Sequence, residues 1–222
     1  MFKKHIKAIS WLIFSILFVF LIAGCSSYMQ AKYEPTTWLF KPGSTPIAAK
    51  TTYNVTGATV KSPNEPGWYL APSKYYGVNF GRKYGEKNET VIALTTMHKV
   101  EGFENDRDFL NHMVERRVAE DDASRFKILQ ANNEFISFKH TACFKYKWLT
   151  EDHKNTGINS SEFQYINAIG YICRHPDNPI IAFQMEISYR GEGKKLPEEI
   201  RALGEEFFED IELKKQGLDA IK

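Results

Sequence analysis

Residues 135–149, FISFKHTACFKYKWL, place mainly apolar side chains at every second position and mainly polar side chains between them. Side chains at alternate positions of a β-strand point to the same face of the sheet. The stretch therefore predicts one long strand with a buried face and a solvated face. The buried face is Ile136, Phe138, His140, Ala142, Phe144, Tyr146 and Trp148, and the solvated face is Ser137, Lys139, Thr141, Lys145 and Lys147.

Weaker strand patterns and two helical patterns surround this strand. Asn132 and Asn133 predict a tight turn before it, and a polar loop over 150–162 is expected after it. Helical spacing predicts one helix from Asn105 or Asp106, and Pro197 opens a second helix that runs to about residue 213. We expect an α+β fold, a mostly antiparallel sheet of about six to seven strands packed by two helices. The other expected strands are 68–71, 75–84, 91–97, 126–131, 163–174 and 180–189.

Two cysteines, Cys143 and Cys173, lie in strands on either side of the expected loop. A hairpin centred near residue 158 would place them opposite each other, and 158 is close to the middle of the loop. We therefore predict a structural disulfide, although a register slip of one residue would separate the two side chains. Two unpaired buried thiols are the alternative.

The N-terminus has the three parts of a secretory signal. Lys3, Lys4 and Lys7 come first, an apolar run extends over 8–23, and small residues lead to Cys25. The ending LIAGC, residues 21–25, resembles the lipobox of bacterial lipoproteins. This resemblance implies cleavage before Cys25 and a diacylglyceryl group on its thiol. The alternative is an uncleaved membrane anchor.

A lipoprotein of this kind is expected at the cell envelope. The residues after the cysteine are Ser26 and Ser27, and the lack of Asp there favours the outer membrane, facing the periplasm. Without the three signal lysines, 26 Lys and Arg face 27 Asp and Glu, which gives a net charge of −1. This balance gives no reason to expect nucleic acid as a partner.

Composition divides the chain into four parts: a signal peptide over 1–24, a Pro- and Thr-rich tether over 25–66, one α+β domain over 67–213 and a short polar tail over 214–222. Trp38, Leu39 and Phe40 interrupt the polar tether and are a candidate partner contact, although packing on their own domain is the commoner outcome. The element order over 67–213 is similar to the PsbP-like fold. That resemblance implies an accessory or assembly role without a catalytic site.

Motifs for catalysis or metal binding are missing from the sequence. We found no phosphate-binding loop, nucleophile elbow or His-Glu-x-x-His pattern, and we expect no cofactor, metal site or catalytic residue. The expected function is a non-enzymatic accessory or scaffold component of an envelope protein assembly. The alternative is a module that binds a small apolar or envelope-derived ligand in a pocket between sheet and helix, lined by His140, Tyr146 and Tyr171. An enzyme is the third interpretation.

Overall fold

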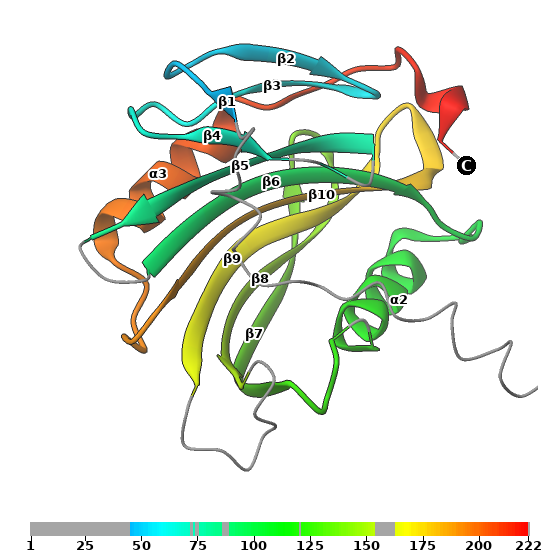
Figure 1. Ribbon diagram of the computed structural model, residues 1–222. Coiled ribbons are helices and arrows are strands. Elements are labelled where there is room, and N and C mark those ends of the chain that lie inside the picture. The colour runs from blue at the N-terminus through cyan, green and yellow to red at the C-terminus, as the bar shows by residue number, and fades with distance from the viewer. Residues whose placement is uncertain are drawn as a thin grey trace, which may run out of the picture. The chain divides into compact units, whose positions relative to one another are not determined.

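A large antiparallel sheet organises the computed structural model, which describes residues 45–71, 73, 76–85, 89–119, 121–153 and 163–221 (Figure 1). All of these residues belong to the unit Thr36–Lys222. The sheet has eight strands in the order β1-β4-β5-β6-β10-β9-β8-β7. The fold is therefore α+β, as the sequence predicts. The strands are β1 (Thr45–Pro46), β4 (Tyr69–Ala71), β5 (Tyr76–Tyr84), β6 (Glu89–Lys99), β7 (Phe126–Phe138), β8 (Thr141–Asp152), β9 (Gln164–His175) and β10 (Asn178–Gly191).

A second, three-stranded sheet corrects two of the predicted boundaries. It consists of β2 (Thr52–Val55), β3 (Ala58–Lys61) and β11 (Glu212–Leu213). The predicted tether therefore ends too late, because residues 45–66 include three strands and Val60 is fully buried. The predicted polar tail is also folded: it contains the short 3-10 helix η1 (Leu218–Ala220), and Leu218 and Ile221 are buried.

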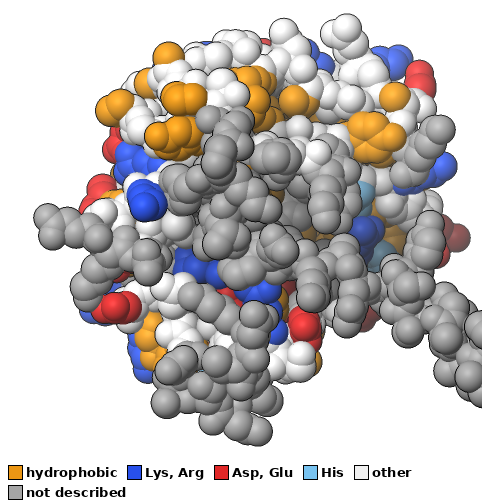
Figure 2. Space-filling model, in the orientation of Figure 1, with side chains coloured by type: hydrophobic (Ala, Val, Ile, Leu, Met, Phe, Trp, Pro, Cys, Tyr) orange, Lys and Arg blue, Asp and Glu red, His pale blue; other side chains and the backbone are white. Residues whose placement is uncertain are grey.

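Two helices lie on opposite faces of the large sheet: α2 (Asp106–Ala119) and α3 (Glu198–Glu209). We call these faces the α2 face and the α3 face. The small sheet shares the α3 face, where Tyr53 and Phe207 both approach Phe80. In the view of Figure 2, hydrophobic side chains gather at the top, over the small sheet and the strands beside it. None of the described helices is long and apolar enough to span a membrane.

The packing of each helix follows from its sequence. The side-chain oxygen of Asn105 accepts a hydrogen bond from the Asp108 N–H at 2.9 Å, which caps α2 as expected. On α3, Ile200, Leu203 and Phe207 follow one another at helical spacing, and all three are buried. Gly204 lets α3 approach the sheet closely, because a Cβ there would lie 2.4 Å from a methyl carbon of Ile187.

The β7–β8 hairpin differs from the predicted turn. Asn132 and Asn133 lie inside β7, and the chain reverses at Lys139 and His140. Both turn residues have positive φ, 50° and 62°, as a two-residue type I′ hairpin requires. The predicted turn at Asn132 was therefore wrong. The alternating pattern of residues 135–149 spans two strands instead of one.

Candidate functional site

The two predicted cysteines form a disulfide between the neighbouring strands β8 and β9. Cys143 pairs directly with Cys173 in the strand register, and their Cα atoms are 4.1 Å apart. Both side chains are fully buried. The disulfide lies on the α3 face, within the larger hydrophobic core. It therefore joins two neighbouring strands and is sealed from solvent, which indicates a structural role.

The three predicted pocket residues do not converge on one cavity. Tyr146 is buried beneath α2, whereas Tyr171 contacts Phe208 of α3 on the opposite face, with ring centroids 5.4 Å apart. His140 is exposed in the β7–β8 turn. The prediction of one shared pocket was wrong because cross-strand partners share a face: Tyr171 lies opposite Lys145, which faces away from Tyr146.

A buried polar network surrounds Tyr146 instead. Its hydroxyl donates to a Glu186 carboxylate oxygen at 2.7 Å and accepts from the Gln184 amide at 3.2 Å. Burial and the neighbouring Glu186 carboxylate raise the pKa of Tyr146 well above its usual value, so the hydroxyl stays protonated. The polar groups of this network form hydrogen bonds with one another, and no set of reactive groups converges among them.

Arg117 extends that network from α2. Burial opposes its charge, but Glu186, Tyr146 and Asp121 keep its pKa above the ordinary value. Its guanidinium lies 3.8 Å from a Glu186 oxygen and 4.9 Å from the ring centroid of Trp148. The arginine therefore ties α2 to β8 and β10.

A second buried charge, Asp152, lies near the end of β8. Its carboxylate accepts two hydrogen bonds from Arg125, at 2.7 and 2.9 Å, and pairs with Arg190 at 2.6 Å. Asp152 is fully buried, and its single negative charge is in direct contact with the two arginines. The arrangement fixes the start of β7 against β8 and β10.

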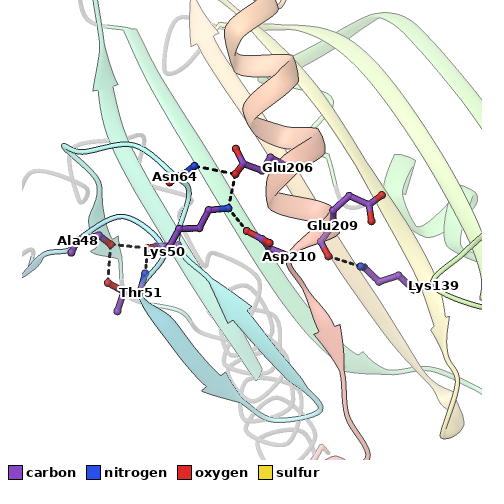
Figure 3. Close-up of polar contacts among 9 residues, drawn as sticks. Ala48, Lys50, Thr51, Asn64, Lys139, Glu206, Glu209 and Asp210 are labelled. Atoms are coloured by element: carbon purple, nitrogen blue, oxygen red, sulfur yellow. Dashed lines mark hydrogen bonds and ion pairs between the residues drawn. The ribbon is translucent and has the colours of Figure 1, made fainter.

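Figure 3 shows two lysines at the C-terminal end of α3. Lys50 pairs with Asp210 and with Glu206, the latter at 2.6 Å, and Lys139 donates to the carbonyl oxygen of Glu209 at 3.0 Å. The last turn of α3 contains no basic residue, so both positive charges come from other segments and complement the helix dipole. Burial lowers the pKa of Lys139, and the nearby acids partly offset this effect. The cluster is structural in character.

His140 lines a surface pocket of about 560 Å³ at the hairpin end of the sheet. Arg174 is in its wall, where it donates to Asp106 at 2.8 Å and to the Phe103 carbonyl at 2.8 Å. His175 is also in the wall and is 1 % exposed. Its Nε2 atom lies 3.2 Å from the carbonyl oxygen of Gly57, so His175 links the large sheet to the β2–β3 turn. The charged groups of this pocket are thus already engaged with protein partners.

A groove between α2 and β7 exposes apolar surface to solvent. This α2–β7 groove holds about 370 Å³, with Val114 on the helix wall and Phe135 on the strand wall. Val118, Leu129 and Phe135 are the exposed large hydrophobic residues of the described chain, at 48 %, 38 % and 36 % exposure. All three are on α2 or β7, which makes this side of the molecule the candidate interaction surface. The groove residues are Asn111, Val114, Glu115, Asn133 and Phe135.

β7 is also an open edge of the sheet. Among the described strands it pairs with β8 alone, over its whole length of 13 residues. Its outer side therefore presents backbone N–H and C=O groups that another strand can pair with. The sequence contained a signal for this surface, because Leu129 and Phe135 flank a polar stretch. The predicted turn at Asn132 obscured it.

Some of the predicted features lie outside the described residues. Cys25 and the triplet Trp38, Leu39 and Phe40 lie outside the described residues. Within the described part of the chain, no group of three or more His, Cys, Asp or Glu side chains is placed to hold a metal.

Comparison with known proteins gives a weak structural likeness and no match in sequence. No family model matches the sequence, and no curated protein matches it. Among solved structures, the chain is similar to the solution structure of cyanobacterial PsbP (CyanoP) from Synechocystis sp. PCC 6803, at 12% sequence identity and a TM-score of 0.45. The match covers 79% of this chain and 99% of that one.

Proposed function

We propose that this protein is a non-enzymatic accessory or scaffold component of a cell-envelope protein assembly, held at the membrane by lipid on Cys25. The observation that carries the proposal is the α2–β7 groove beside the open edge of β7. Phe135 lines the groove, and Val118 and Leu129, on the same helix and strand, also expose apolar surface. Surfaces of this kind are typical of protein–protein contacts.

The lipid anchor is supported by the sequence of the signal. Lys3, Lys4 and Lys7, the apolar run and the LIAGC motif together favour lipid attachment at Cys25 and an outer-membrane position facing the periplasm. A buried disulfide is in keeping with an oxidising compartment. More than one acyl chain is needed for stable anchoring, and a lipoprotein modification supplies that number.

Crosslinking in the native cells tests the partner. The full-length protein is crosslinked and purified, and the co-purifying proteins are identified for wild type and for Phe135→Asp. The matched control is Lys147→Asp, which changes an exposed strand residue away from the groove. We expect a stoichiometric protein that is lost with Phe135→Asp and kept with Lys147→Asp.

A deletion of residues 36–40 in the same experiment separates the two candidate contacts. If Trp38, Leu39 and Phe40 form the contact, the deletion removes the partner and Phe135→Asp does not. A clean preparation without any partner would reject the scaffold proposal.

The anchor has its own test. Cys25→Ala protein should remain unprocessed, lack the mass of the lipid and leave the outer-membrane fraction. Maturation to the same mass and retention on the membrane would contradict lipid attachment at Cys25.

A small-ligand role is the second candidate, and the pocket beside His140 and Arg174 favours it. That pocket is about 560 Å³, within the usual size range of small-molecule sites. Native mass spectrometry of protein purified from its own cells should then show an added mass that Ala142→Trp removes. Ala142 lines this pocket, and a larger side chain would fill it.

A further inference from the structure

The two edges of the large sheet are protected very differently. One edge is β1, which has two residues and ends at Pro46. Short edge strands and proline both prevent a further strand from pairing. The other edge is β7, with 13 residues, no proline, and Glu134 as the one charge between Ile128 and Phe138. Among the described strands, one edge of the sheet is thus short and carries a proline, whereas the β7 edge is long and suited to pairing.

In the central segment of β7 the pattern of apolar and polar residues is partly symmetric about Asn132, although Ala131 is matched with Asn133. Counted outward from Asn132, polar Gln130 matches polar Glu134, and Leu129 matches Phe135. The symmetry is limited to this central segment, because beyond the bulge Ile128 packs in the core under α2, whereas Ile136 packs in the core on the α3 face. An edge that complements itself in this way fits a second copy of the same edge.

We propose that β7 pairs antiparallel with β7 of a second copy of this chain, about a twofold axis at Asn132. Gln130 of one copy then lies opposite Glu134 of the other, where its amide donates to the carboxylate. This inference goes beyond the proposed function, because it names what pairs with the edge and leaves the α2–β7 groove free for a different protein.

The β-bulge at the end of β7 is compatible with this register. The irregularity lies between Ile128 and Gln130, and β7 is regular from Gln130 to Phe138. The central pairs therefore use straight strand, and Phe135 of one copy meets the bulged segment around Leu129 of the other. Leu129 then loses part of the solvent exposure that it has in the single chain.

The twofold axis stands perpendicular to the sheet, so both α2 helices lie on the same face. Asn133 and Phe135 form the strand side of the groove in one copy and continue into the same residues of the other. Two separate grooves thus become one longer groove, whose floor is the paired β7 strands and whose walls are two α2 helices.

Cysteine trapping in the full chain, expressed in its own cells, tests the register. The Cα atoms of opposed antiparallel residues are about 4.5 to 5.5 Å apart, which suits a disulfide. Asn132→Cys should therefore form a covalent dimer on non-reducing gels. Gln130→Cys alone should stay monomeric, since its two copies would be offset by four residues, about 13 Å. Gln130→Cys and Glu134→Cys chains with different tags, expressed together, should form a mixed dimer.

Co-purification of two differently tagged chains tests the pairing without new cysteines. Asn132→Lys places two like charges on the axis and should reduce co-purification at least tenfold, whereas Asn132→Gln should not. Asn132 is exposed, so neither change disturbs the core. A monomeric Asn132→Cys protein with its Cys143–Cys173 bridge intact would overturn the proposal, and so would equal dimer formation by Gln130→Cys. If the edge stays monomeric while another protein is still lost with Phe135→Asp, only this inference fails and the proposed function stands.

Discussion

Glu186 is the residue on which the buried contacts beneath α2 depend. Its carboxylate accepts from the Tyr146 hydroxyl and faces the guanidinium of Arg117. Glu186→Gln removes one of the two carboxylate charges beside Arg117 and leaves Asp121 as the other, so we expect the free energy of unfolding to fall by roughly 2 to 3 kcal/mol. Glu115→Gln, on the exposed side of α2, is the matched control and should change it by less than about 0.5 kcal/mol.

Urea unfolding of the two variants measures this difference. Equal stability of Glu186→Gln and wild type would show that the buried charge pair contributes nothing to the fold.

His175 makes the free energy of unfolding depend on pH, and the direction follows from its lowered pKa. Burial lowers its pKa below 6.5, and the Gly57 carbonyl offsets this only in part. As the pH falls below 6.5, the unfolded chain takes up a proton on this residue before the folded protein does. Its contribution to stability is therefore complete above pH 6.5 and is lost as the pH falls, with a slope of at most about 1.4 kcal/mol per pH unit.

Unfolding free energies measured from about pH 7.5 downward through 6.5 test this, because the histidine of the unfolded chain takes up its proton near its ordinary pKa. His175→Gln should show a shallower slope than wild type over this range. An identical slope in His175→Gln and wild type would refute the assignment to His175.

Single residues were predicted correctly where strand register alone decided the outcome. Cys143 and Cys173 lie opposite each other because both are 15 residues from position 158, the centre of the β8–β9 hairpin. This spacing is visible in the sequence. Tyr146 and Tyr171 were grouped together wrongly, because the face that each occupies depends on the position of the preceding turn. The sequence does not distinguish a Lys139–His140 turn, which needs two non-glycine residues at positive φ, from a turn at Asn132 and Asn133.

At the scale of the element, α3 depends on a glycine inside the helix. Gly204→Ala would raise helix propensity, but the new methyl would collide with Ile187 of β10. We expect the variant to lose about 1 to 3 kcal/mol of stability, because the helix must move away from the sheet. The exposed Ala202→Gly should lose about 1 kcal/mol through propensity alone.

Thermal unfolding followed by circular dichroism compares these two helix variants. A Gly204→Ala protein more stable than wild type would mean that α3 does not pack as closely as described.

The helices were predictable as elements because their capping residues and apolar spacing are local. Asn105 marks the start of α2, and the apolar stripe of α3 predicted its buried side. The small sheet was missed because β3 pairs with β11 from the far end of the chain, through Thr59 and Glu212. No local pattern encodes that contact.

For the whole molecule, the disulfide is the main covalent restraint in the described chain. It joins residues 30 apart in sequence, and closing a loop of that size corresponds to about 3 to 4 kcal/mol in the chain-entropy model. The double variant Cys143→Ala, Cys173→Ala should lose about that much stability, measured by urea unfolding under non-reducing conditions. The same stability for the variant and for oxidised wild type would contradict a restraint of this size.

The disulfide also has a mechanical consequence. A pulling force that enters at residue 45 and leaves near residue 221 passes along the backbone to Cys143, crosses the sulfur–sulfur bond and continues from Cys173. The segment between the cysteines, which holds most of β8 and β9, then carries no tension. About 30 residues, or roughly 100 Å of extended chain, stay out of reach of such a force until the bond is reduced.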